Sequence, residues 1–229
     1  MAVLEEPVVL VAITIIVYYF FVELCRRVPN PIANPILLAI LTLIAFVKLA
    51  DIDLSVYQRS GTLLSFWLGP ATVALAVPLY RHLPLILKHK ATIGIGIVVG
   101  SSTAVLSAVG TAKLLKASST VVAALVPKSV TTPIAIEISR MIGADPELAA
   151  GLVIATGILG AILGPQWLRI CKVTSPFARG LAMGTASHAI GTARALQEGE
   201  LQGSTSGLAI GLAGLYTALI SPLIVWWLL

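Results

Sequence analysis

Long runs without a charged side chain constrain this chain more than any other feature. Residues 91–112 and residues 204–229 contain no Asp, Glu, Lys or Arg. A helix of about 20 apolar residues is long enough to cross the hydrocarbon core of a bilayer. Only 11% of the 229 residues are charged, against roughly 25% in an ordinary soluble domain. Because so little charge cannot cover a soluble surface, the sequence predicts an integral membrane protein and excludes a soluble enzyme and a nucleic-acid-binding protein.

The apolar segments are of two kinds. Long runs predict full transmembrane helices over residues 7–25, 31–49, 61–80, 91–112, 147–168 and 204–229. Two further segments, 118–140 and 180–195, are short and polar, and the second is too short to cross as a helix that rises about 1.5 Å per residue. The sequence therefore predicts an all-α membrane protein with about six full transmembrane helices and two broken or re-entrant segments.

The basic loops predict the orientation of these segments, since cytoplasmic loops are rich in Lys and Arg. The pair Arg26–Arg27, the loop 81–90 and the loop 169–179 are all basic. All three lie inside only if the first short segment enters from outside and returns, which leaves Lys113 and Lys116 external. The second short segment then enters from inside, and the N-terminus lies outside.

Opposed discontinuous segments are typical of secondary transporters with inverted repeats. A weak internal similarity in composition supports such a repeat. We therefore expect one membrane domain over residues 1–229 that moves as an elevator-like transporter. Its scaffold is expected in residues 7–60 and the long spans, and its transport core in 61–80, 118–140 and 180–195.

The run 127–133 is the sharpest chemical feature. Lys128 lies inside an apolar segment, where an ammonium costs about 2.5–3.5 kcal/mol on insertion scales and needs a partner. Pro127 and Pro133 interrupt the helix on both sides. Thr132 before Pro133 is typical of an N-cap followed by proline at the first helical position. A half-helix that begins at mid-membrane presents free N–H groups and a positive dipole end to an anion.

The neighbours of Lys128 favour a carboxylate site. Hydroxyl groups beside it are supplied by Ser129, Thr131 and Thr132. In the alternative interpretation Lys128 pairs with Glu137 or extends its ammonium to the membrane interface.

The second candidate segment, residues 183–194, is rich in small and hydroxyl residues. Its candidate ligands are Thr185, Ser187, His188 and Thr192. A break at Gly191 would let Thr192 cap a second half-helix. His188 is suited to bind substrate or carry a proton, because an imidazole titrates near neutrality; the alternative is that it satisfies a neighbouring carbonyl. Arg194 is expected as an interface anchor or a charge partner.

Two further positions are weaker candidates. Thr72 follows the helix-breaking pair Gly69–Pro70 and either lines the site or marks a kink. Asn34 lies between two prolines and either caps the second span or contacts the site. No catalytic constellation, metal-ligand set or phosphate-binding loop is present in the sequence, so we expect neither an enzyme nor a cofactor.

Three stretches closely resemble the LrgB/CidB family: residues 68–80 (LGPATVALAVPLY), 127–135 (PKSVTTPIA) and 179–194 (RGLAMGTASHAIGTAR). The resemblance implies a multi-pass protein of the bacterial inner membrane. Bacterial members are described as holin- or antiholin-like regulators of murein hydrolase export and autolysis, often paired with a small LrgA- or CidA-type membrane protein. A plastid relative exchanges glycolate and glycerate, and some bacterial pairs are linked to pyruvate uptake.

The residues and the family resemblance together predict one main function and one alternative. The main prediction is a homodimeric secondary transporter of small monocarboxylates such as glycolate, glycerate or pyruvate, coupled to H⁺ or Na⁺. The alternative is a holin- or antiholin-like regulator of murein hydrolase export that works with an LrgA- or CidA-type partner.

Overall fold

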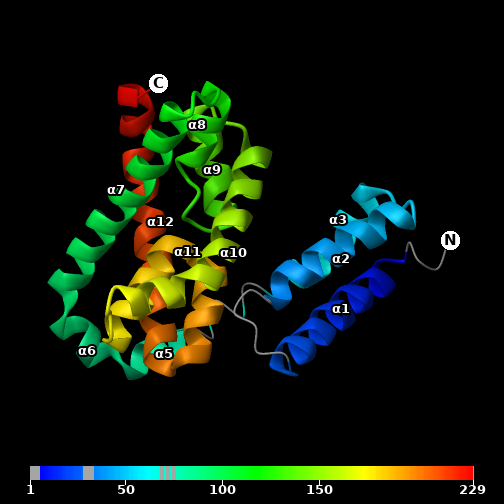
Figure 1. The fold of residues 1–229 in the computed structure, drawn as a ribbon, viewed down its shortest axis with the longest axis horizontal. Helices are drawn as coiled ribbons and strands as arrows, with labels where there is room; N and C mark the ends of the chain where they lie inside the picture. The colour runs from blue at the N-terminus through cyan, green and yellow to red at the C-terminus, as the bar shows by residue number, and fades with distance from the viewer. Residues whose placement is uncertain (1–5, 28–33, 68–69, 71–72, 74–75, 229) are drawn as a thin grey trace. The chain divides into compact units, whose positions relative to one another are not determined.

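A computed structural model describes residues 6–27, 34–67, 70, 73 and 76–228 (Figure 1). The helices are α1 (Pro7–Arg27), α2 (Pro35–Leu49), α3 (Leu54–Ser65), α5 (Ala76–Arg81), α6 (Leu83–Lys88), α7 (Lys90–Leu114), α8 (Ser119–Leu125), α9 (Thr132–Ile142), α10 (Pro146–Ile170), α11 (Pro176–Glu198) and α12 (Glu200–Leu228). The described residues contain no strand. The predicted all-α membrane protein is confirmed.

The chain forms two compact units, residues 1–74 and residues 75–229. Within the first unit, a hydrogen bond of 3.0 Å between Thr14 Oγ1 and Tyr57 OH joins α1 to α3. Asp53 begins α3 by accepting from the backbone N–H of Ser55 at 2.7 Å. That backbone hydrogen bond lowers the pKa of the Asp53 carboxyl below its ordinary value.

Four helices of the described chain are long and apolar enough to cross a membrane, namely α1, α7, α10 and α12. Large apolar side chains are exposed along them, as expected for surfaces that face lipid. The apolar helix α2 has only 15 residues. The predicted span over residues 61–80 is not one helix, because α3 ends at Ser65 and α5 begins at Ala76. Most residues between Trp67 and Ala76 lie outside the described part of the chain.

Helix α11 folds back on itself. Its backbone breaks at His188, where φ is 42° and ψ is −136°. Arg179 Nη2 and Glu198 Oε2, which lie near its two ends, form an ion pair of 2.8 Å. A continuous helix would separate these residues by about 28 Å, at 1.5 Å per residue. The residues 176–187 and 189–198 are therefore the two arms of a re-entrant structure, which we call the α11 hairpin.

Helices α8 and α9 form a second re-entrant structure, the α8–α9 hairpin. The intervening residues 126–131 are not helical. Ile142, at the end of α9, packs against the same aliphatic cluster as Ala117, which precedes α8. The two outer ends of this hairpin therefore lie at the same end of the unit.

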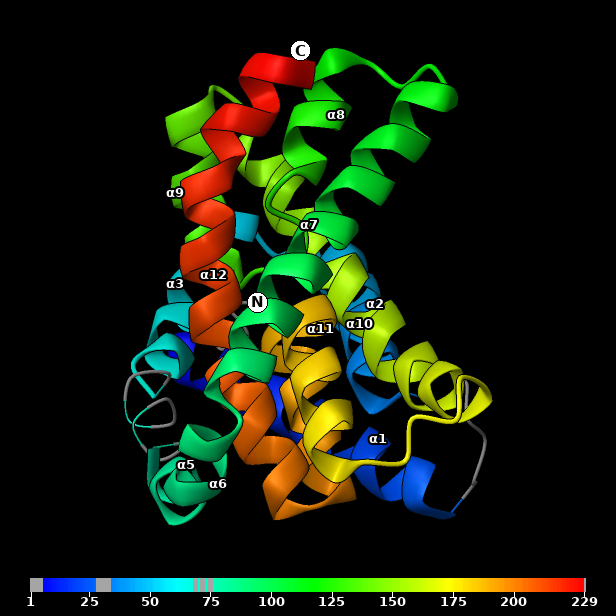
Figure 2. The ribbon, with the colours of Figure 1, turned by 90° about the vertical axis from the view of Figure 1, so that its left-hand side faces the viewer.

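The two hairpins enter the second unit from opposite ends (Figure 2). The start of α7 packs against the first arm of the α11 hairpin through Ile93 and Leu181. The end of α7 packs against α8 through Val109 and Val122. Because α7 is a single helix of 25 residues, these contacts lie far apart along the unit. The two broken segments predicted from the sequence are thus found in the structure, with bounds that differ by a few residues.

The two basic loops of this unit lie at one end, as the charge pattern predicted. The rings of His89 and Phe177 are 5.2 Å apart, which brings the loop before α7 against the start of α11. Arg81 Nη1 also lies 3.3 Å from Glu200 Oε1, at the start of α12. The assignment of this end to the cytoplasm, and of the N-terminus to the outside, stays a prediction.

Candidate functional site

The breaks in the two hairpins bring two titratable side chains together inside the second unit. Lys128 lies in the break between α8 and α9, and His188 is the break in the α11 hairpin. Val153 of α10 links the two breaks, because it packs against Val130, two residues after Lys128, and its backbone oxygen lies 2.9 Å from His188 Nε2. The structure thus joins the two segments that the sequence proposed separately, and we call this region the Lys128–His188 centre.

Lys128 has no carboxylate within 4.0 Å among the described residues. Its Nζ donates to Ser129 Oγ at 3.0 Å. The proposed pair with Glu137 is not formed, because Glu137 Oε1 instead accepts from Arg140 Nη1 at 2.7 Å on an exposed surface. The ammonium of Lys128 is therefore available to an anion from outside the chain.

The start of α9 lies beside this lysine. Thr131, and not Thr132, is the N-cap residue, so Pro133 occupies the second helical position. No side-chain hydrogen bond caps the helix, although Ala135 N donates to Thr131 O at 2.8 Å. The first N–H groups of a helix have no partner within it, and here they begin at the break that carries Lys128.

His188 is fixed by α10. Its Nε2 lies 2.9 Å from the backbone oxygen of Val153. Because a carbonyl oxygen only accepts, Nε2 carries a proton in this contact, and Nδ1 of the neutral ring is left as an acceptor. Space for the ring is provided by Gly157, since a Cβ at that residue would lie 2.6 Å from His188 Cε1. The carbonyl contact foreseen for His188 is thus present.

The backbone of His188 is in a region that non-glycine residues seldom adopt. Such a conformation costs of order 1–3 kcal/mol and persists only where the surroundings impose it. The break therefore lies at His188 and not at Gly191, the position considered from the sequence. Gly191 instead allows close packing, because a Cβ there would lie 2.5 Å from Ser187 Cβ and 2.7 Å from Met183 O.

The three predicted hydroxyl ligands of the α11 hairpin are buried. Thr185 Oγ1 donates to Leu181 O at 2.8 Å. Thr192 Oγ1 donates to His188 O at 2.9 Å and lies 2.7 Å from Ser206 Oγ, so it does not cap a half-helix. Ser187 packs against Gly160 of α10. The hydroxyls of Thr185 and Thr192 therefore help to stabilise the hairpin.

The remaining predicted residues lie away from the Lys128–His188 centre or outside the description. Arg194 Nη2 lies 3.6 Å from Glu198 Oε1, at the base of the α11 hairpin. Asn34 belongs to the first unit and caps α2, where its Oδ1 accepts from Ile36 N at 2.9 Å. Thr72 lies outside the described residues.

Two features of the site were missed in the sequence. Consecutive buried hydroxyl residues at 204–206 on α12 face the α11 hairpin, and Ser206 bonds to Thr192. The side of α10 that packs against that hairpin has no Cβ atoms at three positions, Gly157, Gly160 and Gly164, and we call it the glycine face. Both signals were readable, the first as three hydroxyls inside an apolar span and the second as glycines at helical spacing.

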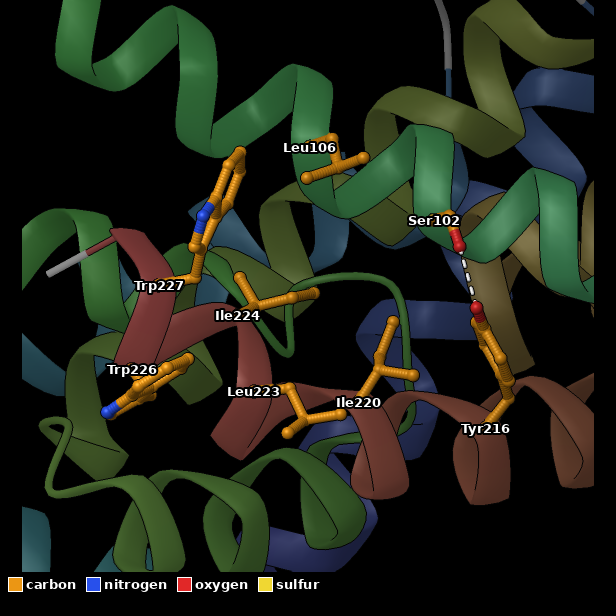
Figure 3. Close-up of a pocket in the computed structure, with 8 residues that line it drawn as sticks. All are labelled: Ser102, Leu106, Tyr216, Ile220, Leu223, Ile224, Trp226 and Trp227. Atoms are coloured by element: carbon orange, nitrogen blue, oxygen red, sulfur yellow. Dashed lines mark hydrogen bonds between the residues drawn. The ribbon is translucent and has the colours of Figure 1, made fainter.

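An apolar groove of about 370 Å³ between α7 and α12 is a separate feature (Figure 3). Its polar contact is the 2.8 Å hydrogen bond between Ser102 Oγ and Tyr216 OH. Trp226 and Trp227 line one end of it. None of its lining residues carries a positive charge, so it offers nothing to pair with an anion.

Comparisons with known proteins place the chain in a family. It matches the LrgB-like family over residues 14–227. It is 35% identical to uncharacterized protein YwbG of Bacillus subtilis (strain 168), over 92% of this chain and 93% of that one. It is 33% identical to uncharacterized protein YxaC of the same strain, over 96% and 95% of the two chains.

A third relative carries a functional name. The antiholin-like protein LrgB of Bacillus cereus (strain B4264) is 33% identical over 83% of each chain. No solved structure matches the chain. The name of this relative favours the antiholin-like alternative over the transport prediction. The match over almost the whole length confirms the expected relationship: the chain belongs to the LrgB-like family.

Proposed function

We propose that this membrane protein carries small monocarboxylates across the bilayer through the Lys128–His188 centre. One observation carries the proposal: Lys128 lies at a break between half-helices without a carboxylate partner among the described residues. An ammonium in the membrane interior costs about 2.5–3.5 kcal/mol. A substrate carboxylate offsets this cost by direct pairing, which makes occupancy by an anion favourable.

The neighbouring groups give each end of such a substrate a partner. The carboxylate pairs with Lys128 and accepts from the N–H groups at the start of α9, beside Thr131 and Thr132. Nδ1 of His188 accepts a hydrogen bond from the hydroxyl of a 2-hydroxy acid, or binds the coupling proton itself, while Nε2 contacts Val153 O. The opposed hairpins supply the elements that move against the long spans during alternating access.

A second candidate function is favoured by a different observation, the antiholin-like name of a relative. In that function the chain regulates envelope permeability and murein hydrolase export, with a small LrgA- or CidA-type membrane protein as partner. It requires oligomers or partner contacts and gives no role to a half-buried lysine that has no carboxylate partner among the described residues. The relatives favour regulation, whereas the geometry of the second unit favours transport. For both functions we propose the bacterial inner membrane and a homodimer.

Counterflow in proteoliposomes tests the transport proposal. Purified full-length protein is reconstituted with unlabelled glycolate or pyruvate inside, and uptake of the radiolabelled acid is measured. Lys128→Ala should reduce saturable uptake to the level of empty liposomes. The matched control Lys88→Ala removes an exposed lysine and should keep uptake within about twofold, because a solvated charge contributes little.

The same liposomes separate the candidate functions. Uptake by Lys128→Ala equal to that of Lys88→Ala, with both proteins folded by thermal melting, would refute the transport site. Release of a bulky entrapped dye by large oligomers, without saturable uptake, would establish the regulatory alternative instead.

A further inference from the structure

A groove of about 500 Å³ runs between α7 and α8 and reaches Lys128. It extends from the turn that joins these helices, at Leu115 and Ala117, to the break beyond α8. Its volume falls in the range of about 300–1,000 Å³ that is usual for small-molecule sites. The groove therefore connects one end of the second unit with the lysine that the proposed function assigns to the substrate carboxylate.

The lining of the groove restricts what it can hold. Among the described residues that line it, Lys128 alone carries a charge, and Ser107 and Thr111 supply hydroxyls. The other lining residues are alanine or aliphatic. A single carboxylate finds its counter-charge at Lys128. A second carboxylate on the same molecule would lie against aliphatic side chains, where an unpaired charge is strongly unfavourable.

The opposite side of the centre is well packed. The polar side chains of the α11 hairpin at this level, Thr185, Ser187 and His188, are no more than 5% exposed. That hairpin is also packed against the glycine face of α10. The α7–α8 groove reaches the Lys128 side of the centre, from the end of the unit that lies opposite the basic loops.

We propose that this groove is the entry and selectivity site for monocarboxylates with a short apolar body, such as 2-oxo acids with one- to three-carbon alkyl groups, and that it rejects dicarboxylates. The proposal rests on the proposed function of Lys128 and specifies the class of substrate. The substrate carboxylate pairs with Lys128, and the alkyl body occupies the space beside Ala108 and Leu125.

Competition against radiolabelled pyruvate tests the selectivity. 2-Oxobutyrate and 2-oxoisovalerate should inhibit uptake at least as strongly as unlabelled pyruvate, because each methylene buried in an apolar site strengthens binding by about fourfold. Oxaloacetate should be at least about 100-fold weaker, because its second carboxylate has no partner. Inhibition by oxaloacetate as strong as that by 2-oxobutyrate would overturn the selectivity.

A substitution pair tests the route. Ala108→Phe fills the groove, whereas Val99→Phe adds an aromatic ring at an exposed position of α7 that does not line the groove. Pyruvate uptake should fall at least tenfold in Ala108→Phe and stay within twofold in Val99→Phe. Equal uptake by the two variants would exclude the groove as the route, while loss of uptake in Lys128→Ala would still support the function.

Cysteine protection gives a second readout that does not depend on a bulky substitution. Thr111→Cys is made in a background with Cys25→Ser and Cys171→Ser, which removes both free cysteines of the described chain. Pyruvate should slow modification of the new cysteine by a membrane-impermeant thiol reagent at least threefold. Modification at the same rate with and without pyruvate, in protein that transports it, would overturn the route.

Discussion

The contact between Gly157 and His188 permits a sharp test of how the α11 hairpin is held. A Cβ added at Gly157 would lie 2.6 Å from His188 Cε1, 2.7 Å from its Nε2 and 2.9 Å from Ile190 Cδ1. Ordinary carbon contacts begin at about 3.5 Å. Gly157→Ala must therefore displace the imidazole, which is buried and bonded to Val153 O on the same helix.

The size of the effect follows from three terms. Alanine is better than glycine inside a helix by about 0.8–1 kcal/mol. Overpacking a well-packed interior costs typically 1–3 kcal/mol, and loss of the hydrogen bond between His188 and Val153 leaves buried polar groups unsatisfied at about 1–3 kcal/mol. The free energy of unfolding should therefore fall by about 1–5 kcal/mol in Gly157→Ala.

A matched control lies one and a half turns earlier on α10. A Cβ at Gly151 would have no neighbour within 4 Å, so Gly151→Ala should keep only the favourable helix term. Thermal unfolding of both variants in detergent measures the difference, at about 2–4 °C per kcal/mol for a chain of this size. Gly157→Ala should melt well below Gly151→Ala. Equal melting temperatures would show that the imidazole does not occupy the space beside Gly157.

Two further variants examine the tip and the base of the same hairpin by thermal unfolding. His188→Gly should melt above His188→Ala, because glycine adopts φ of 42° without the strain of about 1–3 kcal/mol that alanine would carry; the reverse order would contradict the strained backbone. Arg179→Met should destabilise the protein more than Arg140→Met. The Arg179–Glu198 pair is largely buried, so its loss leaves a buried carboxylate without a partner. The Arg140–Glu137 pair is exposed, and such a pair stabilises a protein by at most about 1 kcal/mol. Equal melting temperatures for these two would show that the ion pair does not hold the hairpin closed.

The re-entrant segments could be predicted because their signals are local. A basic residue indicates a cytoplasmic loop whatever the tertiary structure of the chain. A proline interrupts a helix without any contribution from distant residues. The position of both basic loops at one end of the second unit is the consequence that the charge pattern required. Lys128 was identified for the same reason, since a charge inside an apolar segment stands out without any knowledge of its neighbours.

The residues that surround Lys128 and His188 could not be predicted from the sequence. The two structural uses of glycine explain why. A glycine in a small-residue run serves either a positive φ or a close approach of two elements. The sequence offered Gly191 as a place where the helix could break, yet Gly191 serves close packing and the positive φ is at His188.

Whether a glycine serves a positive φ or close packing depends on the element that packs against it, and that element is distant in sequence. His188 is held in its strained conformation by Val153 and Gly157, more than thirty residues earlier in the chain. Strained backbone clusters at functional sites, so the conformation of His188 supports the proposal that the tips of the two hairpins bind substrate, independently of the missing carboxylate partner of Lys128 among the described residues.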